Sequence, residues 1–163
     1  GAFTVGDAGG AMVVGPAEGG EAGISKFRCG AISDYHKLCS YKHEESGAVS
    51  FNMDMARISA VTLKLCKDLV GPIYDDLDWS PDDVDIFIPH QVGARPFEKV
   101  LKIAGVSEDR SIATYPKLGN LASATLPVCF DLLEDQGRVE KGQKMLMVAT
   151  GSGIVATFLG VVL

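Results

Sequence analysis

The chain has 163 residues, 47% of them apolar, and a formal net charge of −6 at pH 7. This length and composition suit one domain with a buried core and exclude an intrinsically disordered chain. The acidic balance and the lack of a Lys/Arg cluster exclude nucleic acid as an expected partner. No apolar run is long enough to span a membrane, and none has the form of a signal peptide. Because the chain starts with Gly1 rather than Met, we expect residues to precede it.

The four cysteines are widely spaced and form no Cys-x-x-Cys pair: Cys29, Cys39, Cys66 and Cys129. Zinc sites and thioredoxin-like motifs need closer spacing, so both are excluded. His36 and His43 share no helical face, and their polar segment, residues 33–47, is predicted to be a solvated loop rather than a metal site. Reduced thiols are the rule in the cytoplasm, where we expect this protein.

The first half of the sequence predicts two strands and a helix. Residues 3–15 are typical of a strand interrupted by glycines, and after a turn residues 24–32 predict a second strand. The glycines lack the Lys and the spacing of a phosphate-binding loop. Residues 54–69 predict a helix capped by Asp54 and ended or kinked at Gly71-Pro72, with an apolar stripe of Ile58, Val61, Leu65 and Leu69.

Residues 84–93 contain the most informative stretch. Apolar residues predict a buried strand that stops at Pro89, after which His90 and Gln91 are expected to be exposed. Residues 94–104 have helical spacing, so His90 lies between a strand and a helix. In α/β sheets, ligands collect at that edge.

The last third of the sequence predicts a short strand, a turn, a helix and a hairpin. Residues 111–115 predict the strand, residues 116–120 a tight turn, and residues 121–135 a helix that Pro127 kinks or delays. Two final strands, residues 144–150 and 154–163, are joined by the turn Gly151-Ser152-Gly153. Too few residues follow this turn for a dinucleotide-binding unit. The order of elements implies an α/β fold in which helices cover a mixed sheet.

Four motifs, in this order, resemble a known family: the opening Gly6-Asp7 segment, His90-Gln91, Gly119-Asn120 followed by small residues and Pro127, and Gly151-Ser152-Gly153. The sequence is similar to the C-terminal half of thiolase-fold condensing enzymes, specifically the β-ketoacyl-acyl-carrier-protein synthase III family. The resemblance implies a thiolase-like half with a mixed five-stranded sheet covered by helices, the C-terminal domain of a duplicated α-β-α-β-α fold. Residues 1–20 would be the last strand of a missing N-terminal half, and residues 21–163 the C-terminal domain.

The resemblance also implies roles in Claisen condensation. His90 and Asn120 would be the catalytic donors that stabilise an enolate oxygen, and the backbone at Gly151, Ser152 and Gly153 would form a second oxyanion hole. Acyl groups would be carried on CoA or on the phosphopantetheine of an acyl carrier protein, with no further cofactor. Arg95, Lys99 and Lys102 would contact the acidic carrier, although an ordinary solvated helix face explains them equally well. The complete enzyme would be a homodimer.

The family's nucleophilic cysteine has no counterpart here, since even Cys39, in Leu-Cys-Ser, lies in a polar setting. We therefore expect a chain that is inactive without an N-terminal partner half that bears the cysteine. Gly93 and the closing Gly-Ser-Gly-Ile are more similar to enzymes of long-chain olefin biosynthesis, which condense acyl-CoAs without decarboxylation. The alternatives are an enzyme like 3-hydroxy-3-methylglutaryl-CoA synthase or chalcone synthase, and a non-catalytic half-domain that only packs against its partner.

Overall fold

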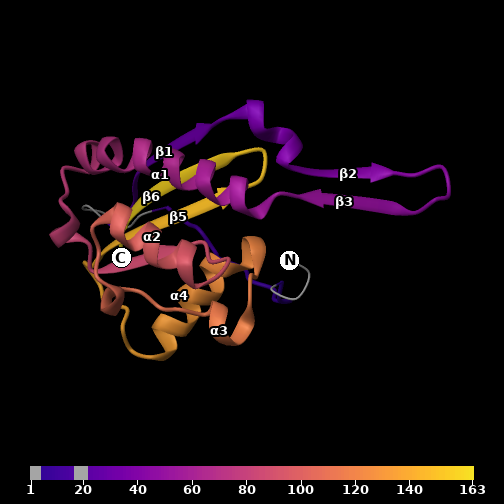
Figure 1. The fold of residues 1–163 in the computed structure, drawn as a ribbon. Coiled ribbons are helices and arrows are strands. Elements are labelled where there is room, and N and C mark those ends of the chain that lie inside the picture. The colour runs from indigo at the N-terminus through magenta and orange to yellow at the C-terminus, as the bar shows by residue number, and fades with distance from the viewer. Residues whose placement is uncertain (1–4, 17–21) are drawn as a thin grey trace.

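The computed structural model describes residues 5–16 and 22–163. Its centre is a mixed sheet in the order β1-β6-β5-β4 (Figure 1). The pairing of β4 with β5 is parallel, whereas the other two pairings are antiparallel. The bounds of the four strands are β1 Gly23–Ala31, β4 Ile86–Pro89, β5 Lys144–Gly151 and β6 Val155–Val162. The predicted α/β class and the closing hairpin are confirmed, but the sheet has four strands rather than five.

Two predicted strands do not form. Across residues 5–16 the only pairing is an isolated parallel bridge between Val5 and Asn120. Residues 111–114 have no regular structure, and Tyr115–Leu118 forms the one-turn helix α3 after the 3-10 helix η4 (Glu108–Arg110). A strand needs a neighbour to satisfy its backbone, and neither segment pairs with an edge strand of the sheet, β1 or β4. The predicted turn at residues 16–23 falls mostly on residues that the structure does not describe.

Helix α1 spans Met55–Leu77 and is longer than predicted. Asp54 caps it as expected, its carboxylate accepting a hydrogen bond from the Arg57 amide at 3.0 Å. An end or a kink was predicted at Gly71-Pro72, and the helix does not end there, because it continues through Pro72 for another turn and more. That last part buries Ile73, Tyr74 and Leu77 in the core, which offsets the hydrogen bond that the proline cannot donate.

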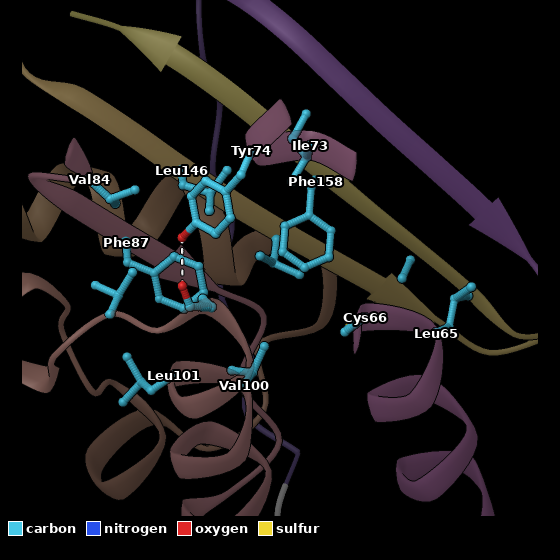
Figure 2. Packing of buried hydrophobic residues seen from close by; sticks show 14 of the residues in the cluster. Leu65, Cys66, Ile73, Tyr74, Val84, Phe87, Val100, Leu101, Leu146 and Phe158 are labelled. Carbon is cyan, nitrogen blue, oxygen red and sulfur yellow. Dashed lines mark hydrogen bonds between the residues drawn. The ribbon is translucent and has the colours of Figure 1, made fainter. Parts of the chain in front are cut away.

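Helices α1 and α2 (Ala94–Ala104) cover one face of the sheet, and their packing forms the larger core. From the sheet come Phe87, Leu146 and Phe158, all fully buried. The Tyr74 hydroxyl donates to the Ala104 carbonyl at 2.7 Å and so ties α1 to the end of α2 (Figure 2). The α2 bounds agree with the prediction. The turn before β4 contains the 3-10 helix η3 (Pro81–Asp83).

Helix α4 (Thr125–Asp135) covers the opposite face of β4 and β5. The 3-10 helix η5 (Ala122–Ala124) leads into it, and Pro127 lies in its first turn. First-turn amides have no partner within a helix, so a proline there costs little. The delayed start predicted from Pro127 is confirmed. Leu133, Met145 and Met147 are among the side chains buried on this face.

Residues 33–47 were predicted to be a loop, and this is wrong. They form a 3-10 helix, η2 (Ser33–Leu38), and the first strand of a hairpin, β2 (Cys39–His43) with β3 (Val49–Met53). The hairpin projects away from the sheet (Figure 1). Its polar and apolar residues alternate, and this alternation indicates strands even though the segment is polar overall.

Among the described residues, no helix has the length and apolar character that crossing a membrane requires.

Gly160 of β6 provides a test of the packing between the sheet and α1. A Cβ at this position would lie 2.5 Å from Cδ2 of buried Leu77. We expect Gly160→Ala to lower the free energy of unfolding by about 1–3 kcal/mol, measured by urea denaturation. Gly71→Ala is the matched control: no atom lies within 4 Å of its added Cβ, so the helix should gain about 0.5–1 kcal/mol. Equal effects of the two substitutions would contradict this packing.

Candidate functional site

Four of the five residues predicted at the catalytic centre line one open cavity of about 620 Å³: His90, Asn120, Gly151 and Ser152. They come from three places in the sequence. His90 follows β4, Asn120 follows α3, and the glycine turn joins β5 to β6. The fifth, Gly153, does not line the cavity. The structure thus brings together side chains that are up to about sixty positions apart in the chain.

His90 is held by the sheet. Its backbone amide donates to the Val148 carbonyl at 2.7 Å, which extends the parallel ladder one residue beyond Pro89. Burial lowers the pKa of the imidazole, and the nearby backbone carbonyl of Ala122 only partly offsets this effect. The ring is therefore neutral at pH 7, and one ring nitrogen carries a proton that it can donate.

Asn120 is oriented by its own loop. Its Oδ1 accepts a hydrogen bond from the Ala122 amide at 2.9 Å. A backbone N–H can only donate, so the atom facing it must be the oxygen of the carboxamide, and the NH₂ group is left to point elsewhere. The Asn120 carbonyl accepts from the Gly6 amide at 3.0 Å. Both contacts restrict the position of the carboxamide at the cavity.

Ala122 is a residue that the sequence analysis missed. Its φ of +50° lies in the left-handed region, which is rare for a residue with a Cβ. In this conformation its amide holds Asn120, and its carbonyl faces His90 and accepts from the Thr125 hydroxyl at 2.9 Å. Strain of this kind is common at functional sites. An alanine gives no sequence signal for it.

The turn after β5 is positioned by the hairpin and by the N-terminal part of the chain. Gly151 is the last residue of β5 and pairs with Val155 of β6. Gly153 has a φ of +120°, which only glycine adopts readily. The next residue, Ile154, is fully buried and exchanges two backbone hydrogen bonds with Ile32. Ser152 itself is exposed at the tip.

Gln91 was expected to be exposed, and this is wrong: its side chain is completely buried. Its Nε2 donates to the Ile112 carbonyl at 2.7 Å. Its Oε1 accepts from the amides of Thr114, at 2.8 Å, and Tyr115, at 3.2 Å. A polar side chain just after a strand would normally face solvent, but here hydrogen bonds to Ile112, Thr114 and Tyr115 satisfy it in the interior.

The rest of the cavity wall is largely apolar. Tyr41, Phe51 and Met53 of the hairpin lie on one side, next to Met55 and Ile58 of α1. The rings of Tyr41 and Phe51 stack with their centroids 4.7 Å apart. Tyr41 is 72% exposed, so this wall is open to solvent.

The predicted carrier-binding residues lie on the outer surface of α2. Lys99 and Lys102 line a shallow groove together with Lys64 and Lys67 of α1. Lys64 is already paired with Asp68 at 2.8 Å. Arg95, at the start of α2, is exposed and does not line this groove. The groove is therefore basic, although the net charge of the chain is negative.

None of the four cysteines lines the cavity that holds Asn120 and Ser152. Cys66 lies in a smaller apolar pocket of about 70 Å³ that also reaches His90. Burial raises the pKa of the Cys66 thiol to about 11 and also raises that of Cys129. Both are therefore neutral thiols and poor nucleophiles at pH 7.

The depressed pKa of His90 can be measured directly. We expect the ring-proton NMR titration of His90 to have its midpoint below 6.5, the ordinary value. A histidine whose folded-state pKa lies below its unfolded value takes up protons preferentially when unfolded, so stability is lost as the pH falls below about 6.5. His90→Gln should reduce this loss in urea denaturation between about pH 7 and pH 5. A midpoint above 6.5 would contradict the burial of the ring.

Comparison with known proteins identifies a family. The family model for the C-terminal part of 3-oxoacyl-[acyl-carrier-protein] synthase III matches residues 74–161. The chain is 30% identical over 132 residues to an acyl-CoA:acyl-CoA alkyltransferase of Shewanella oneidensis, covering 78% of this chain and 38% of that protein. It is 28% identical over 149 residues to the β-ketoacyl-[acyl-carrier-protein] synthase III of Oceanobacillus iheyensis, covering 91% and 46%.

Solved structures show the same fold. The 3-oxoacyl-(acyl carrier protein) synthase III of Pseudomonas aeruginosa superposes with a TM-score of 0.79 at 21% identity, over 91% of this chain and 46% of that one. A variant of OleA from Xanthomonas campestris gives a TM-score of 0.75 at 20% identity, over 86% and 40%.

The chain spans less than half the length of each of these relatives. The matched family segment covers more than half of the chain and contains both His90 and Asn120. The chain therefore belongs to the 3-oxoacyl-[acyl-carrier-protein] synthase III family of thiolase-fold condensing enzymes, of which it is a C-terminal half.

Proposed function

We propose that this chain supplies the enolate-stabilising half of an acyltransferase that joins acyl thioesters by Claisen condensation in fatty-acid or related lipid biosynthesis. The observation that carries the proposal is that the side chains of His90 and Asn120 line one cavity together with the Gly151-Ser152 turn. Family membership supports the class of chemistry. The activity of the complete enzyme is a proposal because the relatives are about twice as long.

In this proposal His90 and Asn120 act on the same oxygen. When the α-carbon of one thioester loses its carboxylate as CO₂, the electrons of the broken C–C bond place negative charge on its carbonyl oxygen. A neutral imidazole N–H and the Asn120 NH₂ group would both donate to that oxygen. The α-carbon then attacks the acyl carbon of the second thioester, a C–C bond forms, and the departing sulfur keeps the electrons of the broken C–S bond. The Ser152 amide would stabilise the oxyanion of that second centre.

The nucleophilic cysteine would come from a separate N-terminal half. The two buried thiols, Cys66 and Cys129, have raised pKa values, which disfavours the thiolate. Cys29 and Cys39 lie outside the cavity that contains His90. No cysteine of this chain therefore combines reactivity with a position beside both donors, and we expect the chain to form no acyl-enzyme by itself.

The apolar wall favours a hydrocarbon substrate. Tyr41, Phe51 and Met53 contribute aromatic and thioether surface to the same cavity as the polar donors. An acyl chain would cover this exposed surface, and removing it from water would favour binding by about 25 cal/mol per Å². A substrate with polar groups along its length would gain nothing there.

A second candidate is condensation of two acyl-CoAs without decarboxylation. It is favoured by the 30% identity to a protein named acyl-CoA:acyl-CoA alkyltransferase and by Gly93, which has a φ of +146°. A residue with a side chain adopts this conformation poorly, so the loop beside His90 favours glycine at this position. Release of CO₂ with the product would distinguish the synthase III reaction from this one.

Donor removal tests the proposal. The test enzyme consists of this chain co-expressed with a cysteine-bearing N-terminal half of the same family, and its β-ketoacyl product is measured by mass spectrometry. We expect His90→Ala or Asn120→Ala to lower kcat by about a hundredfold or more, because each change removes an oxyanion donor worth about 3 kcal/mol.

The matched control is His36→Ala, which removes an exposed histidine outside the cavity, whose Nδ1 lies 2.9 Å from the Ser33 carbonyl oxygen. It should leave kcat unchanged. The chain without its partner half should make no product and gain no acyl mass. Full turnover in both donor variants would remove His90 and Asn120 from the mechanism.

Charge reversal tests the carrier surface. If Lys99 and Lys102 contact an acidic carrier protein, Lys99→Glu/Lys102→Glu should raise KM several-fold for the carrier-bound substrate. The same variant should leave KM for the CoA thioester nearly unchanged. Lys141→Glu, in an exposed turn on another part of the chain, is the control. Equal KM values for carrier-bound substrate in the wild type and the double variant would assign these lysines to an ordinary solvated face.

A further inference from the structure

Gln91 is unusual because every polar atom of its completely buried side chain is used. The Nε2 donates to the Ile112 carbonyl at 2.7 Å and lies 3.4 Å from the Cys129 sulfur. The Oε1 accepts from the amides of Thr114 and Tyr115 and, at 3.3 Å, from the Thr114 hydroxyl. A buried amide with these partners holds its neighbours tightly, because losing any one partner leaves a polar group unsatisfied.

Two of these partners are the amides at the start of α3. The N-terminal amides of a helix have no partner within it, and Thr114, the residue before α3, gives no side-chain cap. Oε1 of Gln91 takes that role from a distant part of the chain. The next residue, Pro116, has no amide hydrogen to satisfy. Gln91 therefore fixes where this one-turn helix begins.

The other end of α3 presents Asn120. The amide of Gly119 closes the helix by donating to the Tyr115 carbonyl at 3.0 Å, and its φ of +70° turns the chain toward the cavity. Gln91 is thus connected to Asn120 by its hydrogen bonds to the start of α3, by the single turn of that helix and by Gly119. Gln91 is also covalently joined to His90, whose position the sheet sets.

We propose that Gln91 is a positioning residue that fixes the carboxamide of Asn120 relative to the imidazole of His90, by capping α3 across the site. Its effect on catalysis rests on the proposed condensing function. The coupling itself is a property of the fold and can be measured without turnover.

The test substitution is Gln91→Met, which keeps the length and approximate volume of the side chain but removes its hydrogen bonds. In the enzyme assembled with a cysteine-bearing half, we expect kcat to fall about a hundredfold, with KM nearly unchanged, because small displacements of catalytic groups cost about that much. Thr114→Val is the matched control. It removes the long hydroxyl contacts to Oε1 and to the Cys129 sulfur but keeps both backbone hydrogen bonds to Gln91, so kcat should stay close to that of the wild type.

Amide hydrogen exchange in this chain measures the coupling. The reporter is the Ala122 amide, which the Asn120 side chain holds, and the Leu146 amide of β5 reports global unfolding. Gln91→Met should speed exchange at Ala122 relative to Leu146, whereas Thr114→Val should not. If Gln91→Met does not fold, Gln91→Asn, which is too short to reach α3, should give the same pattern.

The outcomes separate the two proposals. Faster exchange at Thr114 and Tyr115 with unchanged exchange at Ala122 would overturn the positioning role. Equal acceleration at Ala122 and Leu146 would also overturn it, because Gln91 would then be only a structural residue. Failure of the wild-type assembled enzyme to form β-ketoacyl product would refute the condensing function, while the exchange measurements would still decide whether Gln91 controls Asn120.

Discussion

The parallel pairing of β4 with β5 is the constraint on which the site depends. Parallel strands end at the same edge of a sheet, so His90, one residue past β4, lies beside the turn that follows β5. The hydrogen bond from the His90 amide to the Val148 carbonyl extends this pairing one residue further, to the edge of the cavity. Both faces of the pair are covered, by α1 and α2 on one side and α4 on the other (Figure 1). The histidine is therefore presented by a rigid, desolvated support.

Asn120 reaches the same cavity by a different route. It lies outside the strands of the sheet and follows the one-turn helix α3. Its position follows from a series of local interactions in which buried Gln91 holds the start of α3, Gly119 turns the chain, and the strained Ala122 binds the carboxamide. A donor that must meet a developing charge needs this kind of support, because electrostatic stabilisation depends on groups that do not reorganise during the reaction.

The cavity combines a polar edge with an apolar wall, and the wall comes from the β2–β3 hairpin rather than from the sheet. Tyr41 and Phe51 are exposed although they are aromatic, which is typical of a surface that contacts a ligand or another protein. This chain spans less than half the length of its relatives. In the proposed function, an acyl chain would cover this exposed wall beside His90 and Asn120.

The sequence by itself determined the elements whose patterns are local: α2, the start of α1 at Asp54, the delayed start of α4 at Pro127, and the closing hairpin. The order of its motifs also identified the family, since Asn120 and the glycine turn follow His90 as in the condensing enzymes. Tertiary structure decided what depends on distant partners. Helix α1 continues through Pro72, and Ile73 and Tyr74 beyond it are buried in the core. Residues 5–16 make only an isolated bridge, from Val5 to Asn120, and Gln91 is buried against the start of α3, whose amides it binds. A pattern along the chain records propensity and period, whereas these three outcomes depend on which groups meet after folding.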